Sequence, residues 1–175
     1  MNDSTLYGFG RNFYPPGNAG QWNINEYYHF FAAAKNSSPV TLPTDLKQRF
    51  PGINDGSAIH YQWTHRIPFE IRAMVLTETI LFAAGPKGNT HLSQDAYKGK
   101  QGVVLKALSP QNGRELAEYQ LDALPVFDGL IAANGRLYIT TLGGQVLCLS
   151  TTQGQQFQSA KDARKKGQPR PTGGT

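Results

Sequence analysis

The chain has 175 residues, which is enough for one domain or slightly more. Hydrophobic residues make up 39% and charged residues 17%, and there are 19 glycines and 11 prolines. This composition favours short strands joined by many turns over packed helices. The single cysteine excludes an internal disulfide and a multi-cysteine metal site. No stretch approaches the roughly 18 apolar residues that a membrane span needs.

The net charge of +5 comes mostly from the end of the sequence. The stretch "KDARKKGQPRPTGGT" contains five basic residues and one acidic residue, and so carries +4 of that charge. Such a composition cannot bury a core, and residues 155–175 are therefore predicted to be a disordered, solvated tail. The basic character is confined to this tail, and no pattern of alternating aromatic and basic residues marks the strands. Nucleic acid is therefore not an expected partner.

Residues 1–56 are predicted to hold part of a sheet followed by a long excursion. "STLYGFGR" favours one or two short strands, whereas "NFYPPGNAGQWNINEYYHFFAAAKNSSPVTLPTD" is broken by prolines and predicts one helical turn around Glu26 to Lys35. The aromatic residues of this excursion either form a ligand surface on a long loop or cover the edges of sheets, and we favour the second interpretation. These residues are Trp22, Tyr27, Tyr28, Phe30 and Phe31.

An internal repeat follows in the second half. "RAMVLTETILFAAG" aligns with "DGLIAANGRLYITT" at an offset of 56 residues, and "ALSPQNG" aligns with "CLSTTQG" at an offset of 41. A polar, glycine-rich insertion at 86–101 accounts for the difference, because the later copy has only the short "LGGQ" at this place. The matched positions include Trp63 with Tyr119, Val75 with Ile131, Phe82 with Tyr138 and Ala107 with Cys148.

Two units of about 41 residues, each with four strands, are typical of a β-propeller. We therefore predict an all-β fold, a partial β-propeller in which residues 57–154 form two four-stranded blades and residues 1–56 add part of a third. The strands that carry Trp63 and Tyr119 are expected to be the outermost of their blades. The alternative is a sandwich built from two unrelated pairs of hairpins.

Local patterns within the later unit make the prediction more specific. "VFDGLIAANG" is nearly all apolar and predicts an innermost strand buried on both faces. Asn134-Gly135 and Gly143-Gly144 can supply the positive φ that tight hairpin turns require. Cys148 lies in the apolar strand "QVLCLS" and is expected to be a small core residue.

These stretches resemble the repeat of quinoprotein-type propellers, Ala-x-Asp-x-x-Thr-Gly-Lys-x-x-Trp. In "ALSPQNGRELAEY", Ala107, Gly113 and Arg114 match it, Ser109 replaces the aspartate, and Tyr119 stands two residues beyond the place of the tryptophan. "LPVFDGLIAANGRLYITTLGGQVLCL" is similar to bacterial PQQ-like repeat proteins, including the large ones of planctomycetes. The resemblance implies a propeller in an exported protein that is periplasmic, surface-bound or secreted.

A propeller needs four to eight blades to close its ring, and two units with part of a third are too few. Either the chain is a C-terminal fragment of a longer propeller, or copies associate to complete a ring, and we favour the fragment. The remaining blades of the parent chain are then its expected partners.

No catalytic residue, cofactor ligand or metal ligand set is evident in the sequence. The equivalent residues Arg72 and Asp128 begin the inner strands of the two units, where they could bind a ligand at the rim of the central channel or pair with each other across blades. We favour the ion pair. The sequence thus favours a non-catalytic propeller segment that binds an unidentified protein or cell-surface partner, or acts as a scaffold. The alternative is a fragment of a PQQ-dependent dehydrogenase, for which the resemblance implies PQQ and a calcium ion.

Overall fold

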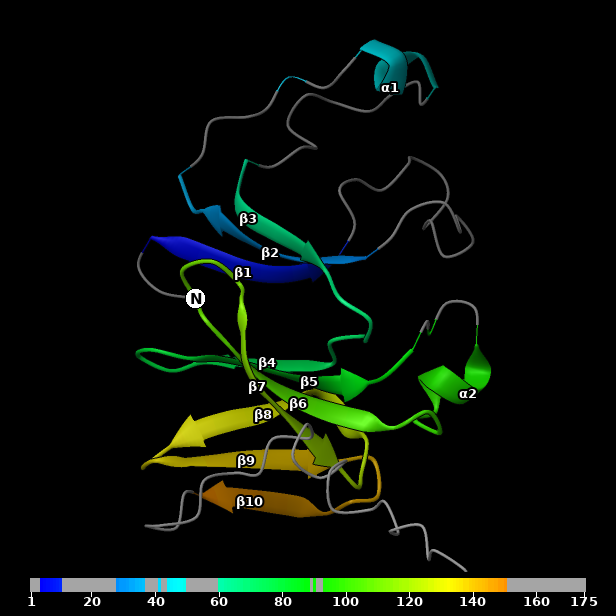
Figure 1. Cartoon of the computed structure of the whole chain (residues 1–175), viewed down its shortest axis with the longest axis vertical. Coiled ribbons are helices and arrows are strands. Elements are labelled where there is room, and N and C mark those ends of the chain that lie inside the picture. Colours follow the sequence, from blue (N-terminus) through cyan, green and yellow to red (C-terminus); the bar gives the residue numbers. More distant parts are fainter. Residues whose placement is uncertain are drawn as a thin grey trace, which may run out of the picture.

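In the computed structural model, the residues described are 4–10, 28–36, 41, 44–49, 60–88, 90 and 93–150. These residues form three antiparallel sheets stacked on one another, together with two short helices (Figure 1). The predicted all-β class is confirmed. None of the helices in the described part of the chain is long and apolar enough to cross a membrane.

Each sheet is built from strands that are consecutive in the sequence. The first sheet has the order β1 (Thr5–Gly10), β2 (His29–Ala34), β3 (Tyr61–Arg66). The second has the order β4 (Ala73–Leu76), β5 (Leu81–Pro86), β6 (Val103–Leu108), β7 (Glu115–Leu121). The third has the order β8 (Pro125–Ala133), β9 (Arg136–Thr141), β10 (Val146–Ser150). The helices are α1 (Thr44–Arg49) and α2 (Gln94–Tyr97).

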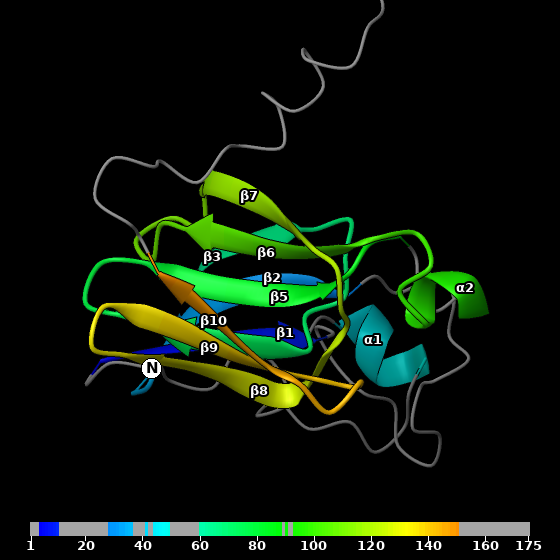
Figure 2. The same ribbon diagram turned by 90° about the horizontal axis from the view of Figure 1, so that it is seen from below.

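The middle sheet is buried on both faces, and its side chains alternate between two separate hydrophobic cores. Along β5, Leu81 and Ala83 pack towards the first sheet, whereas Ala84 and the half-buried Phe82 pack towards the third. This division follows from the strand period of two residues, which sends neighbouring side chains to opposite faces. Figure 2, viewed from below, shows the three sheets overlying one another.

The third sheet repeats the order of the second. β8, β9 and β10 lie in the same sequence as β4, β5 and β6, and the insertion at 86–101 connects β5 to β6, where β9 and β10 are joined by a tight turn. The paired row Val75–Phe82–Ala107 of the second sheet has its counterpart in the paired row Ile131–Tyr138–Cys148 of the third.

The two hairpin turns predicted in the third sheet are present. β8 and β9 are joined by Asn134 and Gly135, with φ of 51° and 70°, and Gly144 in the β9–β10 turn has a φ of 77°. Glycine and asparagine adopt this left-handed region at small cost, so the local sequence is sufficient to place both turns.

The helical turn predicted around Glu26 to Lys35 is wrong, because His29–Ala34 forms the central strand of the first sheet. Phe30 is fully buried and Phe31 is 8% exposed, which agrees with the favoured structural interpretation of these rings. Alanine-rich sequence favours a helix locally, but pairing with strands on both sides outweighs that preference here. Trp22, Tyr27 and the tail at 155–175 lie outside the described residues.

Two expectations about burial in the third sheet are also wrong. Cys148 is exposed, and β8 is buried on one face only, since Leu130 is buried while its neighbour Ile131 is 62% exposed. Both expectations assumed another sheet beyond β8–β10, and in the described part of the chain no strand packs on that side.

Candidate functional site

The strongest candidate site is a cleft of about 820 Å³ where the first strand of the second sheet meets the first strand of the third. β4 packs directly on β8. The cleft, called here the Arg72 cleft, also receives residues from β1 and from the insertion. Its lining residues include Phe9, Glu70, Arg72, Tyr97, Phe127 and Asp128.

Arg72 is the centre of this cleft. Its side chain is 3% exposed, and its Nη2 donates a hydrogen bond of 2.7 Å to the carbonyl oxygen of Tyr97. The guanidinium carbon lies 4.6 Å from the centre of the Tyr97 ring and 5.2 Å from that of Phe127. Arg72 is therefore held by the insertion on one side and by β8 on the other, with cation–π contacts to both rings.

One polar atom of Arg72 has no hydrogen-bond acceptor in the structure. Its buried Nε lies 3.7 Å from Oε1 of Glu70, close enough for an ion pair but too far for a hydrogen bond. A buried donor without an acceptor is uncommon in native proteins and is often satisfied by a bound water or ligand.

Asp128 is placed by a distortion in β8. The register of β8 against β9 shifts between Pro125 and Leu130, and Asp128 has a φ of 56°, unusual for a residue other than glycine. Its amide nitrogen donates to the carbonyl oxygen of Arg72 at 2.9 Å. A bulge of this kind commonly redirects a side chain at a functional site.

The structure thus brings the two predicted site residues together, but not as the favoured ion pair. Asp128 touches Arg72 through the backbone, and the carboxylate beside the guanidinium belongs to Glu70. The reason is that Arg72 turns towards the carbonyl of Tyr97, a residue of the insertion that has no counterpart in the later repeat.

The repeat pattern did not identify Glu70, Tyr97 or Phe127 as site residues. One signal for Tyr97 was present in the sequence, because an insertion carried by one repeat often maps to a loop on the binding face. Glu70 and Phe127 carried no comparable signal, since both lie in apolar surroundings typical of core strands.

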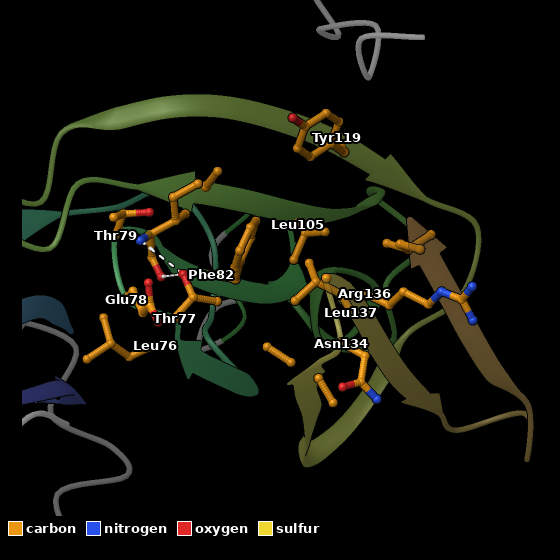
Figure 3. Close-up of a pocket in the computed structure, with 16 residues that line it drawn as sticks. Leu76, Thr77, Glu78, Thr79, Phe82, Leu105, Tyr119, Asn134, Arg136 and Leu137 are labelled. Carbon is orange, nitrogen blue, oxygen red and sulfur yellow. Dashed lines mark hydrogen bonds between the residues drawn. The ribbon is translucent and has the colours of Figure 1, made fainter. Parts of the chain in front are cut away.

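A second cleft, of about 640 Å³, opens between the second and third sheets and is called here the inter-sheet cleft (Figure 3). Its walls are mostly apolar and include Phe82, Leu105 and Leu137, with Tyr119 beside them and Arg136 at the rim. Because its walls are apolar with few polar groups, the cleft offers no set of side chains suited to catalysis. It matters for how the second and third sheets pack together.

Trp63 fills the corresponding place between the first and second sheets. Its Nε1 donates to the carbonyl oxygen of Pro110 at 2.9 Å, and a Cβ added to Gly113 would come within 2.7 Å of the indole ring. The ring also stacks on His65 at 5.6 Å between centres. The glycine is therefore needed for close approach of the indole as well as for its φ of 67°.

A charged cluster lies on the second sheet beside this interface. Lys106 Nζ contacts Glu115 at 2.6 Å and Glu118 at 2.9 Å, and Lys87 contacts Glu118 at 2.9 Å. Burial lowers the pKa of Lys106, but its hydrogen bonds to the two glutamates outweigh this and raise that pKa overall. Burial likewise raises the pKa of Glu118, but Lys87 and Lys106 outweigh it and hold that pKa below 4.5. The charges of the cluster pair with one another, so we interpret it as structural.

The PQQ and calcium ion of the alternative hypothesis stay a prediction. A calcium ion takes six to eight oxygen ligands, several of them carboxylates. Across the described ranges, no three His, Cys, Asp or Glu side chains lie close enough to share a metal ion.

No protein-family model, curated protein or solved structure matches the chain.

Proposed function

We propose that the chain is a segment of a PQQ-like β-propeller that acts as a non-catalytic protein-binding or scaffold module within a larger exported protein. The observation that carries this proposal is the outer face of β8–β10, defined by Ile131, Tyr138, Val146 and Cys148.

The outer face is open, and its apolar residues lie beside the exposed Thr140 and Ser150 of the same face. Ile131 and Val146 are 62% and 65% exposed, Cys148 is exposed and Tyr138 is half-buried. Leu130 and Ile139 point the other way, into the core shared with the second sheet. Large contiguous apolar patches on a soluble surface commonly mark contact sites for other proteins.

The residues of the outer face correspond in the repeat to residues of the second sheet that lie in the hydrophobic core. Val75, Phe82 and Leu105, which the two offsets match to Ile131, Tyr138 and Val146, all pack in the core between the second and third sheets. Residues that bury one sheet against the next are thus repeated, in the same pairing, on a surface left open. This supports a structure in which a further sheet, from the parent chain or a partner, covers β8–β10.

Two further features support the propeller geometry. Consecutive sheets stack with their first strands on the same side, as β4 on β8 illustrates. Trp63 links the last strand of one sheet to the β6–β7 turn of the next, which is the role of the tryptophan in the repeat that this chain resembles. The exported location rests on that resemblance.

A self-association experiment tests the proposal. Without its covering sheet, the outer face is expected to drive concentration-dependent association, measured by light scattering on the purified chain. The double variant Ile131→Lys, Val146→Lys removes apolar surface at exposed positions and is expected to shift the chain to monomer. Its matched control is Leu116→Lys, since Leu116 is 52% exposed but lies on β7.

A wild-type chain that stays monomeric at all concentrations, unfolds in one sharp transition and binds no hydrophobic dye would contradict the proposal. The same holds if Leu116→Lys abolishes association as strongly as the double variant.

A further inference from the structure

The Arg72 cleft combines three kinds of group that together restrict its ligand. It contains the buried guanidinium of Arg72, the carboxylates of Glu70 and Asp128, and the exposed rings of Tyr97 and Phe127. The cleft is separate from the outer face, so the inference below goes beyond the proposed function and does not depend on it.

The charges disfavour a simple ion as ligand. Two carboxylates line the cleft, so an anion that approaches Arg72 also meets Glu70 and Asp128. A cation would pair with Asp128, but it would also meet the positive guanidinium of Arg72, which lies against both rings. A neutral ligand avoids both penalties.

The Arg72–Glu70 pair calls for a group that donates and accepts. Nε of Arg72 has no acceptor, and the carboxylate of Glu70, 3.7 Å away, can accept a hydrogen bond. A hydroxyl group satisfies both, since it accepts from the N–H and donates to the carboxylate. The carboxylate of Asp128, which is exposed, can accept from a second hydroxyl.

The two aromatic rings supply the apolar part of the site. Tyr97 is 46% and Phe127 60% exposed, and Arg72 holds both rings from the buried side. Rings fixed in this way offer flat surfaces to the C–H faces of a sugar ring, as in small-molecule sites that combine aromatic walls with a few polar groups.

We propose that the Arg72 cleft binds a neutral saccharide, with one hydroxyl between Arg72 and Glu70, another on Asp128, and a sugar ring against Phe127 and Tyr97. Nothing in the arrangement performs a reaction on the sugar, and the site is one of recognition.

The test measures binding of maltopentaose, cellopentaose and chitopentaose to the whole chain by isothermal calorimetry and saturation-transfer NMR. At least one is expected to bind saturably with a dissociation constant near 1 mM. Phe127→Ala and Glu70→Gln are each expected to weaken that binding about tenfold, because one removes the ring surface and the other the charged acceptor. Leu142→Ala, at a residue 63% exposed in the β9–β10 turn, is the matched control and is expected to bind as the wild type does.

Thermal unfolding of each variant shows whether the fold is retained, and Phe127→Ala changes an exposed side chain. The proposal is overturned if none of the three saccharides binds at about 10 mM, or if binding survives both cleft variants. It is also overturned if arginine amide or acetate binds more tightly than the saccharides and loses affinity in the same variants. None of these outcomes bears on the association test of the outer face.

Discussion

The two interfaces between the sheets follow the same scheme but are filled differently. Between the first and second sheets, the indole of Trp63 lies on Gly113, and a cleft of about 290 Å³ lies nearby between Tyr7 and Pro110. Between the second and third sheets, Tyr119 holds the matching sequence position and the inter-sheet cleft is about 640 Å³.

The difference shows that the same repeat can pack two neighbouring sheets tightly or loosely, depending on the aromatic residue at one position. A bulky ring that reaches a glycine and a backbone carbonyl of the next sheet fixes the distance and angle between sheets, whereas a smaller ring leaves space. We infer that the first interface is the more stable of the two, and that the second contributes mainly through Leu105, Leu130 and Ile139.

Breaking the tight interface is expected to have the largest effect. In Gly113→Ala, the new Cβ meets Trp63 and His65 at 2.6 to 2.7 Å, and the residue must keep a φ of 67°. We expect a loss of about 3 kcal/mol in the free energy of unfolding, from overpacking and backbone strain together. Urea unfolding measures it.

Gly135→Ala is the matched control, because Gly135 has a φ of 70° but nothing within 4 Å of the added Cβ. It is expected to cost about 1 kcal/mol, which is the backbone strain alone. Equal losses in the two variants would show that Trp63 does not pack against Gly113 as described.

The charged cluster distinguishes the second sheet from the third, because the repeat places Leu147 at the position of Lys106. Glu118→Gln is expected to reduce the free energy of unfolding by about 1.5 kcal/mol at pH 7, as expected for hydrogen bonds to charged groups. The folded pKa of Glu118 is lowered, so its stabilisation is present above pH 4.5 and is lost as the pH falls through the folded pKa. The difference between variant and wild type should therefore shrink in acid.

Asp95→Asn provides the comparison for this charge effect, since the Lys100–Asp95 pair is largely exposed on both sides. It is expected to change stability by less than about 0.5 kcal/mol at any pH. A Glu118→Gln difference that stays constant between pH 7 and pH 3 would rule out ion pairing as the source of its effect.

Filling the loose interface is expected to have the smallest effect. Tyr119→Trp places the larger ring of the first interface at the matching position of the second, beside the inter-sheet cleft. About 40 Å² of additional buried apolar surface would raise the free energy of unfolding by about 1 kcal/mol. Tyr119→Phe, which adds no volume, serves as the control, and stabilisation by both variants alike would mean that cleft filling is not the cause.

Much of the secondary structure could be predicted because it depends on neighbours in the sequence. Asn134-Gly135 marks a hairpin wherever it stands between two apolar runs, and "GRLYITT" alternates as a half-buried strand does. β2 could not be predicted in this way, because "FFAAAK" favours a helix until strands on both sides pair with it.

The candidate site was predictable only in part. Arg72 and Asp128 were found because the repeat places both at the start of equivalent strands. Their actual contacts were not, since Glu70 and Tyr97 reach Arg72 through a link between sheets and an insertion, and neither follows the repeat.

The strand period, the turns and the repeat follow from the amino-acid sequence alone, because they arise from backbone preferences and from the spacing of apolar residues over a few positions. Which faces are buried depends on how the sheets pack together. Ile131 and Cys148 look like core residues in sequence, and so do their counterparts Val75 and Ala107, which are covered by the next sheet. Burial depends on what packs against a face, and this is a property of the assembled sheets rather than of any one strand.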